Sequence, residues 1–423
     1  MSADVLGALV LALVVIVVTA RLLGVLAGRL GQPPVIGEIL AGVLLGPTLF
    51  GGALPEVLFP AAVRPALQQL ADIGVVVFMF LVGVELDRRL LRGRGRVTVS
   101  VAVGAIVVPF GLGVLIAPAL LSDGDPVQQL AFRLFIGTAM SVTAFPVLAR
   151  ILADRGLLHT PVGGLALAAA SLDDVMAWGL LAVVAALAGG TGEPWLVLLV
   201  VPFALVLLFV VRPVLARLCT HASSASGAGR WLSAAAVAVA LPVGLWLSAR
   251  ATEAMGLHLI FGAFLFGVAM PRSGLDATRE RVQRALNRVS SWVLLPVFFT
   301  VAGLQVDLSG LDAGAWGVLG LILLVAMGGK WLGVAAGAGL CGIPPGRSFV
   351  LATLLNTRGL TELIVLTTGL QLGVLDERSY SLLIVMALVT TMMTGVVLSL
   401  LDRAGRPVAE FDPPPLSGVL RST

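Results

Sequence analysis

Two adjacent carboxylates lie near the middle of a long apolar run. The run extends from Pro161 to Leu187 and contains Asp173 and Asp174. If the run crosses a bilayer, each ionised acid at that depth costs about 3 kcal/mol or more. Acids in such positions usually mark ion or proton pathways. This feature therefore indicates a membrane helix that takes part in moving ions.

The lysine content of the chain indicates the same function. Among 27 Lys and Arg residues only Lys330 is a lysine, and it lies inside a second apolar run, 315–340. Arginine keeps its proton in proteins, whereas a desolvated lysine can release it. Two acids and one titratable base at membrane depth suggest a protein that exchanges protons for another cation.

The composition supports the membrane assignment. Of the 423 residues, 58% are hydrophobic and 12% are charged, with a mean hydropathy of +1.06. A soluble domain carries about 25% charged residues. Apolar runs of about 20 residues, which is long enough to span a bilayer, recur along the chain. We therefore expect an all-α polytopic membrane protein in which a single transmembrane domain, 1–401, precedes a short cytoplasmic tail, 402–423.

About thirteen such runs are long enough to be transmembrane helices. The expected spans are 5–27, 33–50, 70–86, 97–120, 128–150, 161–187, 194–212, 231–249, 254–270, 289–306, 315–340, 347–372 and 380–401. Twenty arginines follow odd-numbered spans or lie in the C-terminal tail, and only three or four lie on the opposite side. Because arginine and lysine concentrate in cytoplasmic loops, we expect an external N-terminus and a cytoplasmic C-terminus in the inner or plasma membrane of the cell.

A short motif occurs twice at a fixed spacing. Residues 83–87 read Gly-Val-Glu-Leu-Asp, and residues 303–307, which lie 220 positions later, read Gly-Leu-Gln-Val-Asp. At the same offset, Gly42 and Gly262 lie in similar glycine-spaced segments. The copies are an odd number of spans apart, so they enter the membrane in opposite directions, as in the inverted-topology repeats of secondary transporters. The alternative is that glycine-rich helices resemble one another by composition alone.

We place the two repeats at approximately 5–187 and 231–401, joined by a linker helix at 194–212. The chain contains no Gly-rich phosphate loop, which argues against an ATP-driven pump. We therefore expect a transporter that is not an enzyme and that needs no cofactor. The basic pI near 10 does not indicate binding of nucleic acid, because the arginines lie mostly in short loops between spans.

Two of the expected spans contain polar segments that interrupt a helix. In the span 128–150, Ser141 and Thr143 precede Pro146, which removes the helical hydrogen bond to the carbonyl of Val142. Freed carbonyls and hydroxyls are hard oxygen ligands that suit a small alkali cation. Broken helices persist at this depth where they line a cavity or are buried by protein. The alternative is an ordinary proline kink.

The second polar segment lies in the span 347–372 and contains Asn356, Arg358 and Glu362. Arg358 and Glu362 are four residues apart and can form an ion pair on one helix face. Because their charges satisfy each other, we expect structural roles for this pair, and we expect Asn356 to lie at the same break. Glu38, early in the second span, either caps a helix or lines a path.

Lys330 and the two aspartates fall near the middle of their spans. A salt bridge between Lys330 and one aspartate would offset the cost of burying each charge. Adjacent helical residues point about 100° apart, so one aspartate can face a cavity while the other faces a neighbouring helix. The alternatives are an acid pair that only holds helices together and a lysine that snorkels to the membrane surface.

Five segments carry a family resemblance: QPPVIGEILAG at 32–42, FLVGVELD at 80–87, SVTAFP at 141–146, the Asp173-Asp174 pair, and NTRGLTEL at 356–363. Together they resemble the monovalent cation:proton antiporter family. That family includes bacterial Na⁺/H⁺ antiporters, potassium efflux antiporters and plant cation/H⁺ exchangers. The match extends from the second to the last expected span.

The resemblance implies a homodimer in which a scaffold domain forms the interface and a six-helix core domain carries the site, with two broken helices crossing beside the aspartates. It also implies that Asp174 binds the proton and the metal cation, Na⁺ or K⁺, and that Asp173 is the partner of Lys330. Members with two adjacent acids and this lysine are generally electrogenic Na⁺/H⁺ antiporters. The segment 356–363, however, is closer to the plant-type and potassium-transporting relatives. The nucleotide-sensing domain of the potassium efflux members is missing, so ligand-gated regulation is not expected.

We therefore predict a secondary antiporter that exchanges Na⁺ or Li⁺ for protons, with a role in pH homeostasis. Cation and proton would compete at Asp174, with help from Ser141 and Thr143 and with coupling through Asp173 and Lys330. A K⁺/H⁺ antiporter is the alternative, and a sodium-coupled organic anion symporter or a non-transporting sensor is more remote. The expected partners are the cation, H⁺, membrane lipid and a second copy of the chain.

Overall fold

The computed structural model describes residues 3–49, 53–85, 95–120, 126–157, 160–188, 199–224, 228–255, 259–271, 276–309 and 312–403, and every regular element in these ranges is a helix. The all-α prediction is therefore confirmed. Eight of the described helices are long and apolar enough to cross a membrane, and one bent pair makes a ninth candidate. Two further apolar helices are shorter, so the multi-pass assignment holds while the predicted number of about thirteen spans is not established.

The N-terminal half contains α1 (Ala3–Arg29), α2 (Pro34–Leu45), α3 (Ala53–Leu58), α4 (Arg64–Glu85), α5 (Gly95–Ile116), the 3-10 helix η2 (Ala117–Ala119), α6 (Pro126–Ser141), α7 (Phe145–Asp154) and α8 (Pro161–Leu187). The connection contains α9 (Val200–Val206), the π-helical η4 (Leu207–Val211) and α10 (Arg212–Ser224). The C-terminal half contains α11 (Ala228–Ala254), α12 (Leu259–Ala269), α13 (Asp276–Val289), the π-helical η5 (Ser290–Leu294), α14 (Leu295–Leu304), α15 (Ala313–Gly339), α16 (Pro345–Leu355), α17 (Leu360–Gln371) and α18 (Glu377–Arg403).

The two halves present the same order of helix types. Each begins with a helix of 27 residues, α1 or α11, and continues with a short apolar helix, α2 or α12. Each later contains a long helix, α5 or α15, followed by a helix in two pieces, α6–α7 or α16–α17, and ends with another helix of 27 residues, α8 or α18. This order agrees with the internal repeat predicted from the recurring motif.

The glycines of that motif lie where the two halves pack against each other. A Cβ on Gly83 of α4 would come within 2.3 Å of the carbonyl oxygen of Phe264 on α12. A Cβ on Gly303 of α14 would come within 2.5 Å of the carbonyl oxygen of Ile39 on α2. Each motif glycine therefore allows a helix of one half to lie directly on the backbone of the other half.

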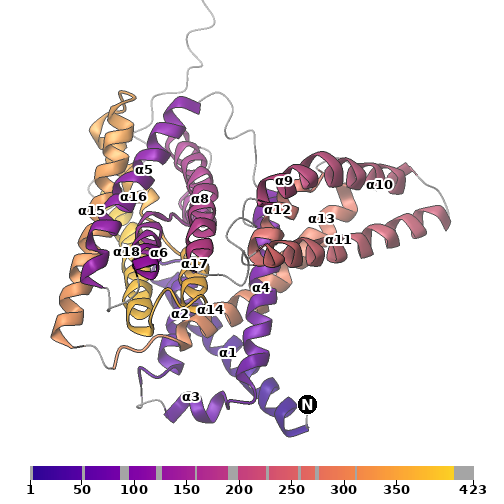
Figure 1. Ribbon diagram of the computed structural model, residues 1–423, viewed down its shortest axis with the longest axis horizontal. Coiled ribbons are helices and arrows are strands. Elements are labelled where there is room, and N and C mark those ends of the chain that lie inside the picture. The colour runs from indigo at the N-terminus through magenta and orange to yellow at the C-terminus, as the bar shows by residue number, and fades with distance from the viewer. Residues whose placement is uncertain are drawn as a thin grey trace, which may run out of the picture.

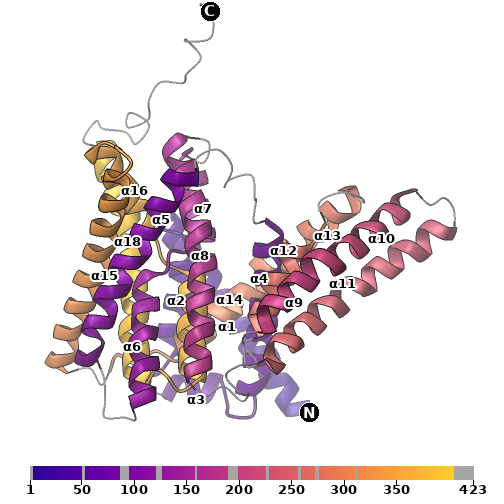
Figure 2. The ribbon, with the colours of Figure 1, turned by 45° about the horizontal axis from the view of Figure 1, so that its top comes forward.

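The helices form two groups in space (Figures 1 and 2). Helices α5–α8 and α15–α18 pack together as the core bundle, and α1, α2, α4, α11, α12 and α14 pack together as the scaffold bundle. In Figure 1 the core bundle lies at the left, while α10 and α11 project to the right. This arrangement has the two-part form that the family resemblance implies.

Small residues let α5 and α15 pack closely within the core bundle. A Cβ on Gly333 of α15 would come within 2.0 Å of the carbonyl oxygen of Gly104 on α5, and a Cβ on Gly337 would come within 2.3 Å of that of Ser100. The Ser100 hydroxyl also donates to the Gly337 carbonyl at 2.7 Å. Small residues at intervals of four let helix backbones approach closely inside a membrane, where apolar burial alone does not drive association.

We expect Gly333→Ala to lower the thermal stability of the purified protein, because its methyl group would collide with the α5 backbone. Gly328 is the matched control, since nothing lies within 4 Å of a Cβ built there. Alanine at such an open helical position adds about 0.5–1 kcal/mol of helix stability. The melting temperature in detergent, monitored by size exclusion, should therefore fall for Gly333→Ala and stay the same or rise for Gly328→Ala. Equal melting temperatures would contradict the close packing of α5 on α15.

Side-chain caps define the starts of the two helices that carry the buried charges. The hydroxyl of Thr160 accepts a hydrogen bond from Gly163 N at 3.1 Å at the start of α8. The carboxylate of Asp312 accepts one from Ala315 N at 2.9 Å at the start of α15. Such caps satisfy backbone N–H groups that a helix leaves without internal partners. They fix the register from which the two aspartates and the lysine are presented at membrane depth.

Candidate functional site

Two interrupted helices cross at the centre of the core bundle. Helix α6 ends at Ser141 and α7 begins at Phe145, while α16 ends at Leu355 and α17 begins at Leu360 with a bend of 48°. Ala144 N donates to Thr357 O at 3.0 Å, and the Thr143 hydroxyl donates to Leu355 O at 2.9 Å. The two extended segments therefore contact each other directly, and the two crossing broken helices of the predicted fold are confirmed.

Pro146 lies just after the first break. It is the second residue of α7, where a missing backbone N–H costs no internal hydrogen bond, so proline favours the start of a new helix there. Its side chain lies outside the described part of the structure. The interruption at 142–144 thus ends two residues before the proline, in the segment where its sequence predicts a break.

The ammonium group of Lys330, a residue of α15, lies at the C-terminal end of α6. This group donates to the carbonyl of Ser141, to the Thr143 hydroxyl at 2.7 Å and to Asp173 Oδ2 at 3.1 Å. The side chains of Lys330 and Asp173 are 0% and 1% exposed. A helix C-terminus carries partial negative charge and free carbonyls, so a cation stabilises it. The lysine therefore offsets both a carboxylate and a helix end, and the ion pair is made with Asp173.

Arg358 supports the same helix end from the second break. Its guanidinium donates to the carbonyls of Ala139 and Met140, the latter at 2.6 Å, and to Glu362 Oε2 at 2.8 Å. Both side chains of the Arg358–Glu362 pair are fully buried. Glu362 lies in the first turn of α17, where the helix dipole favours negative charge. The geometry is that of a structural clamp between the broken helices.

Asp174 lies at helix N-termini, in contrast to Lys330 and Arg358, which lie at a helix C-terminus. Its carboxylate lies next to the backbone N–H of Phe145, the first residue of α7, and the hydroxyl of Thr361 in the first turn of α17. Helix N-termini carry partial positive charge and favour anions. The crossing therefore places its cations at the C-terminal end of α6 and this carboxylate at the N-terminal ends of α7 and α17.

Each aspartate keeps an oxygen with unused acceptor capacity. Asp173 Oδ1 and Asp174 Oδ1 are buried and have no hydrogen-bond partner among the described residues. Leaving a buried acceptor unsatisfied is unfavourable, and such groups in native sites often mark places where a proton or an ion binds. Asp174, 5% exposed, has no cation of its own within salt-bridge distance in the described part of the chain.

The other candidate residues divide into three groups. Thr143 belongs to the Lys330 cluster, and the buried Ser141 hydroxyl donates to Thr138 O at 2.8 Å while its carbonyl binds Lys330. Asn356 caps the end of α16 and is fully buried, and neither amide atom finds a partner within the described ranges. Glu38 lies apart from this crossing, in a cavity between the two bundles.

Threonines that the sequence reasoning did not single out complete the second break. Thr391 of α18 accepts from Arg358 N at 2.9 Å and donates to Arg358 O at 2.7 Å, and Thr394 donates to Thr353 O at 3.1 Å. These hydroxyls satisfy backbone groups that the interrupted helix exposes. The sequence contained a signal for this role: Thr390, Thr391 and Thr394 lie together inside an otherwise apolar run. Thr361, beside Asp174, was likewise missed.

Comparisons with known proteins agree with this geometry. A family model described as "Sodium/hydrogen exchanger, transmembrane" matches residues 12–403. The chain is 37% identical over 393 residues to the Na⁺/H⁺ antiporter NhaS4 of Synechocystis sp., covering 90% of this chain and 94% of the relative. It is 39% identical over 400 residues to cation/H⁺ antiporter 20 of Arabidopsis thaliana, covering 90% of this chain and 46% of the relative. The chain thus spans about half the length of the Arabidopsis relatives it matches.

Two further comparisons concern a yeast protein and a solved fold. The chain is 31% identical to the K⁺/H⁺ antiporter 1 of Saccharomyces cerevisiae, covering 90% of this chain and 44% of the relative. The solved sodium proton antiporter MjNhaP1 of Methanocaldococcus jannaschii matches 96% of this chain with a TM-score of 0.59 at 16% identity, which bears on the fold alone. Because the family model extends over nearly the whole chain, and the fold and the broken-helix crossing agree with it, the chain belongs to the transmembrane sodium/hydrogen exchanger family.

Proposed function

We propose that the protein is a secondary antiporter that exchanges a monovalent cation for protons, with Asp174 as the shared binding group. The observation that carries the proposal is the placement of Asp174: a buried carboxylate at two helix N-termini, beside the Asp173–Lys330 pair. The positive helix ends stabilise the carboxylate form, and its second oxygen is available to a ligand. The names of the relatives, Na⁺/H⁺, K⁺/H⁺ and cation/H⁺ antiporters, support the same class of reaction.

In this mechanism the cation and the proton compete for one carboxylate. When Asp174 is ionised, a cation binds there; when a proton binds to the carboxylate, the cation leaves. Each ligand neutralises Asp174, so the site can carry either one while its access changes from one side of the membrane to the other. Lys330 couples Asp173 to the same event, because a further proton taken up at this pair ends the ion pair that the two make. Uptake of this proton in addition to the one on Asp174 gives more than one proton for each cation, as electrogenic exchange requires. Arg358 and Glu362 keep the end of α6 fixed throughout.

Na⁺ or Li⁺ is the proposed cation, with electrogenic exchange. The adjacent acids and the lysine support this choice, as does the identity to NhaS4 over 94% of that relative's length. The second candidate is K⁺, which the match to the yeast K⁺/H⁺ antiporter favours. The proposed protein is a homodimer, with an external N-terminus and a cytoplasmic C-terminus in the cell membrane.

The proposed domain boundaries follow from the recurring motif and the order of the helices. The repeats are 5–187 and 231–401, with the linker at 194–212. Helix α9, the π-helical η4 and the first residue of α10, Arg212, carry the part of the linker that falls within the described residues, and residues 189–198 lie outside them. Within the proposed cytoplasmic tail, 402–423, only residues 402 and 403 belong to the described part, at the end of α18.

The test is cation-induced dequenching of a pH-sensitive dye in everted vesicles from an antiporter-deficient host. Wild type is compared with Asp174→Asn in Na⁺, Li⁺ and K⁺ over a pH series. A signal with Na⁺ and Li⁺ that vanishes in the variant is the expected result. A signal with K⁺ alone would move the protein to the potassium branch. The absence of any signal in wild type with all three cations would refute the proposed exchange.

We expect Lys330→Ala to weaken exchange or make it electroneutral, because the positive charge that pairs with Asp173 is lost. The measurement is the exchange rate in proteoliposomes at several imposed membrane potentials. Lys330→Arg is the matched variant, since arginine keeps the charge and cannot release its proton. Because Lys330→Ala leaves a buried carboxylate unpaired, its folding is checked against Lys330→Ala combined with Asp173→Asn. An unchanged voltage dependence in Lys330→Ala would remove Lys330 from the coupling step.

A further inference from the structure

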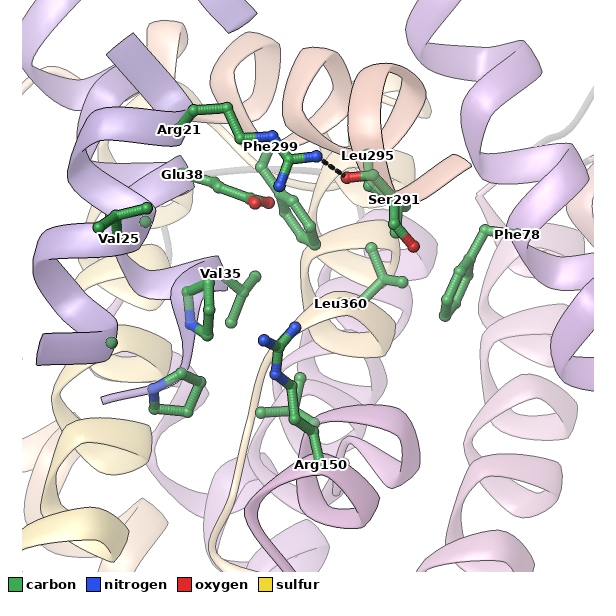
Figure 3. A pocket seen from close by; sticks show the side chains of 15 residues that line it. Arg21, Val25, Val35, Glu38, Phe78, Arg150, Ser291, Leu295, Phe299 and Leu360 are labelled. Atoms are coloured by element: carbon green, nitrogen blue, oxygen red, sulfur yellow. Dashed lines mark hydrogen bonds between the residues drawn. The ribbon is translucent and has the colours of Figure 1, made fainter. Parts of the chain in front are cut away.

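A cavity of about 360 Å³ lies between the scaffold and core bundles, outside the ion-pair cluster. Helices α1, α2, α4 and α14 contribute its scaffold wall, and α7 and α17 contribute its core wall. Figure 3 shows Glu38 and Arg21 at one end of this cavity and the guanidinium of Arg150 directed into it from α7. The cavity thus brings charged side chains of both bundles to one space.

The cavity leads toward the crossing of the broken helices. Its lining includes Val147, two residues after Phe145, and Leu360, the neighbour of Thr361. Phe145 and Thr361 are the two residues that approach the carboxylate of Asp174. The inner end of the cavity therefore lies at the helix ends that hold the proposed exchange site.

A second cavity, of about 400 Å³, lies at the other end of α2 and is built differently. The first cavity includes Pro34, where α2 begins, and the second includes Pro47, which follows its end. The residues that line the second cavity come from the scaffold side, including Glu56 and Arg64, and none comes from the core bundle in the described ranges. Of these two cavities, only the first is lined by residues that neighbour Phe145 and Thr361, the residues that approach Asp174.

Hydrogen bonds join the two bundles near the second cavity. The Tyr380 hydroxyl of α18 donates to Ala302 O of α14 at 2.9 Å, and Asp307 N donates to the Ser381 hydroxyl at 3.0 Å. Tyr380 is fully buried. The bundles thus share two hydrogen bonds near the second cavity, whereas near the first cavity Gln32 Nε2 donates to Met392 O of α18 at a longer 3.4 Å. With the first cavity lying between the bundles, this is the arrangement of a conformation open on the side of Glu38.

Two of the three charged residues that line the first cavity are arginines, which disfavour the entry of a cation. Arg21 is held in place by its bond to Ser291 O at 2.6 Å and by stacking over the Trp292 ring at 4.3 Å. Arg150 approaches from the core bundle, and Glu38, 8% exposed, is the only carboxylate among the fifteen lining residues, all of which are described. Without Glu38 the lining would hold two guanidinium groups and no carboxylate, which disfavours the entry of the cation that the proposed function requires.

We infer that Glu38 is a positioning residue for cation entry: it offsets Arg21 and Arg150 along the cavity and thereby raises the cation concentration near Asp174 from this face alone. The inference rests on the proposed exchange function and assigns its access route. Charges that line a narrow, low-dielectric cleft act on an ion more strongly than charges on an open surface, and they change its local concentration and entry rate. In this role Glu38 does not have to bind the cation while the cation is bound at Asp174.

The first test compares the two faces of the membrane. Glu38→Gln removes the charge with little change in shape, and we expect the half-saturating cation concentration to rise about three- to tenfold. With the proposed external N-terminus, α1 crosses the membrane and α2 begins at the cytoplasmic face, so the rise should occur in everted vesicles, which expose that face, and not in right-side-out vesicles. The maximal rate should stay within about twofold. Glu56→Gln is the matched control, because Glu56 lines the second cavity beside Arg64. Equal half-saturation of Glu38→Gln and wild type on both faces would overturn the inference.

The second test measures the electrostatic potential without transport. The two native cysteines, Cys219 and Cys341, are replaced by serine, and Val35→Cys places a thiol in the cavity wall. A cationic and an anionic methanethiosulfonate then report the local potential through the ratio of their reaction rates. Glu38→Gln should lower the cationic-to-anionic ratio about tenfold, because both reagents respond in opposite directions. An unchanged ratio would overturn the inference, whereas a lowered ratio without exchange in wild type would refute only the proposed function.

Discussion

Replacing Asp174 with asparagine is expected to reduce cation–proton exchange to the background of vesicles without the protein. An amide of the same size keeps the packing but can neither carry negative charge for the cation nor take up the exchanged proton. The buried position at the starts of α7 and α17 offers no other unpaired carboxylate at that spot within the described chain. The expected effect is therefore a loss of turnover rather than a shift in apparent affinity.

The design of this experiment separates chemistry from folding. Asp312→Asn is the matched control, because Asp312 is largely exposed, pairs with Arg378 at 2.8 Å and caps α15, a role that asparagine can also fill. Both variants should elute as wild type in size exclusion, and only Asp174→Asn should lose exchange. Exchange at the wild-type rate by Asp174→Asn would refute the assigned site.

Arg358→Met is expected to give the largest loss of stability among single substitutions at the crossing. Arg358 satisfies two carbonyls at the end of α6 and the buried Glu362, all at 0% exposure of its side chain. Removing one partner of a buried ion pair typically costs about 3–5 kcal/mol, because the other charge stays buried without compensation. We therefore expect a sharply reduced yield and a lower melting temperature in detergent.

Arg378→Met provides the same chemical change at an exposed pair. The Arg378–Asp312 side chains are 56% and 69% exposed, and surface pairs contribute about 0–1 kcal/mol. Combining Arg358→Met with Glu362→Leu should recover part of the lost stability, since no charge is then left unpaired. If Arg358→Met and Arg378→Met melted at the same temperature, the contacts of Arg358 between α6 and α17 would contribute no measurable free energy of folding.

The membrane class and the positions of the helix breaks could be predicted from local sequence. Long apolar runs leave few alternatives to a helix, because backbone groups in lipid must be satisfied within the same segment. The polar segments ending at Pro146 and beginning at Asn356 stood out for the same reason: they interrupt apolar runs at a depth where polar groups are costly. The structure places the interruptions at 142–144 and 356–359.

The partners of the buried charges depended on the tertiary structure. Sequence spacing alone left open which aspartate faces Lys330, because helix rotation decides it. The family resemblance implied Asp173, and the structure places Asp173 there. Sequence reasoning treated Ser141 and Thr143 as cation ligands, whereas the carbonyl of Ser141 and the hydroxyl of Thr143 contact the lysine ammonium in this conformation. It also did not show that Lys330 and Arg358 meet at one helix end, since α15 and the break between α16 and α17 are far from α6 in the chain.

The sequence alone thus determined that this protein crosses a membrane in many helices, that two of them are interrupted, and that acids and a lysine are buried among them. These features follow from the cost of polar groups in lipid, which acts on each segment separately. Only the tertiary structure decided which charge compensates which helix end and that Glu38 faces a cavity between two bundles. Those relations depend on the rotation and crossing of helices distant in sequence, which close packing through glycines such as Gly333 fixes.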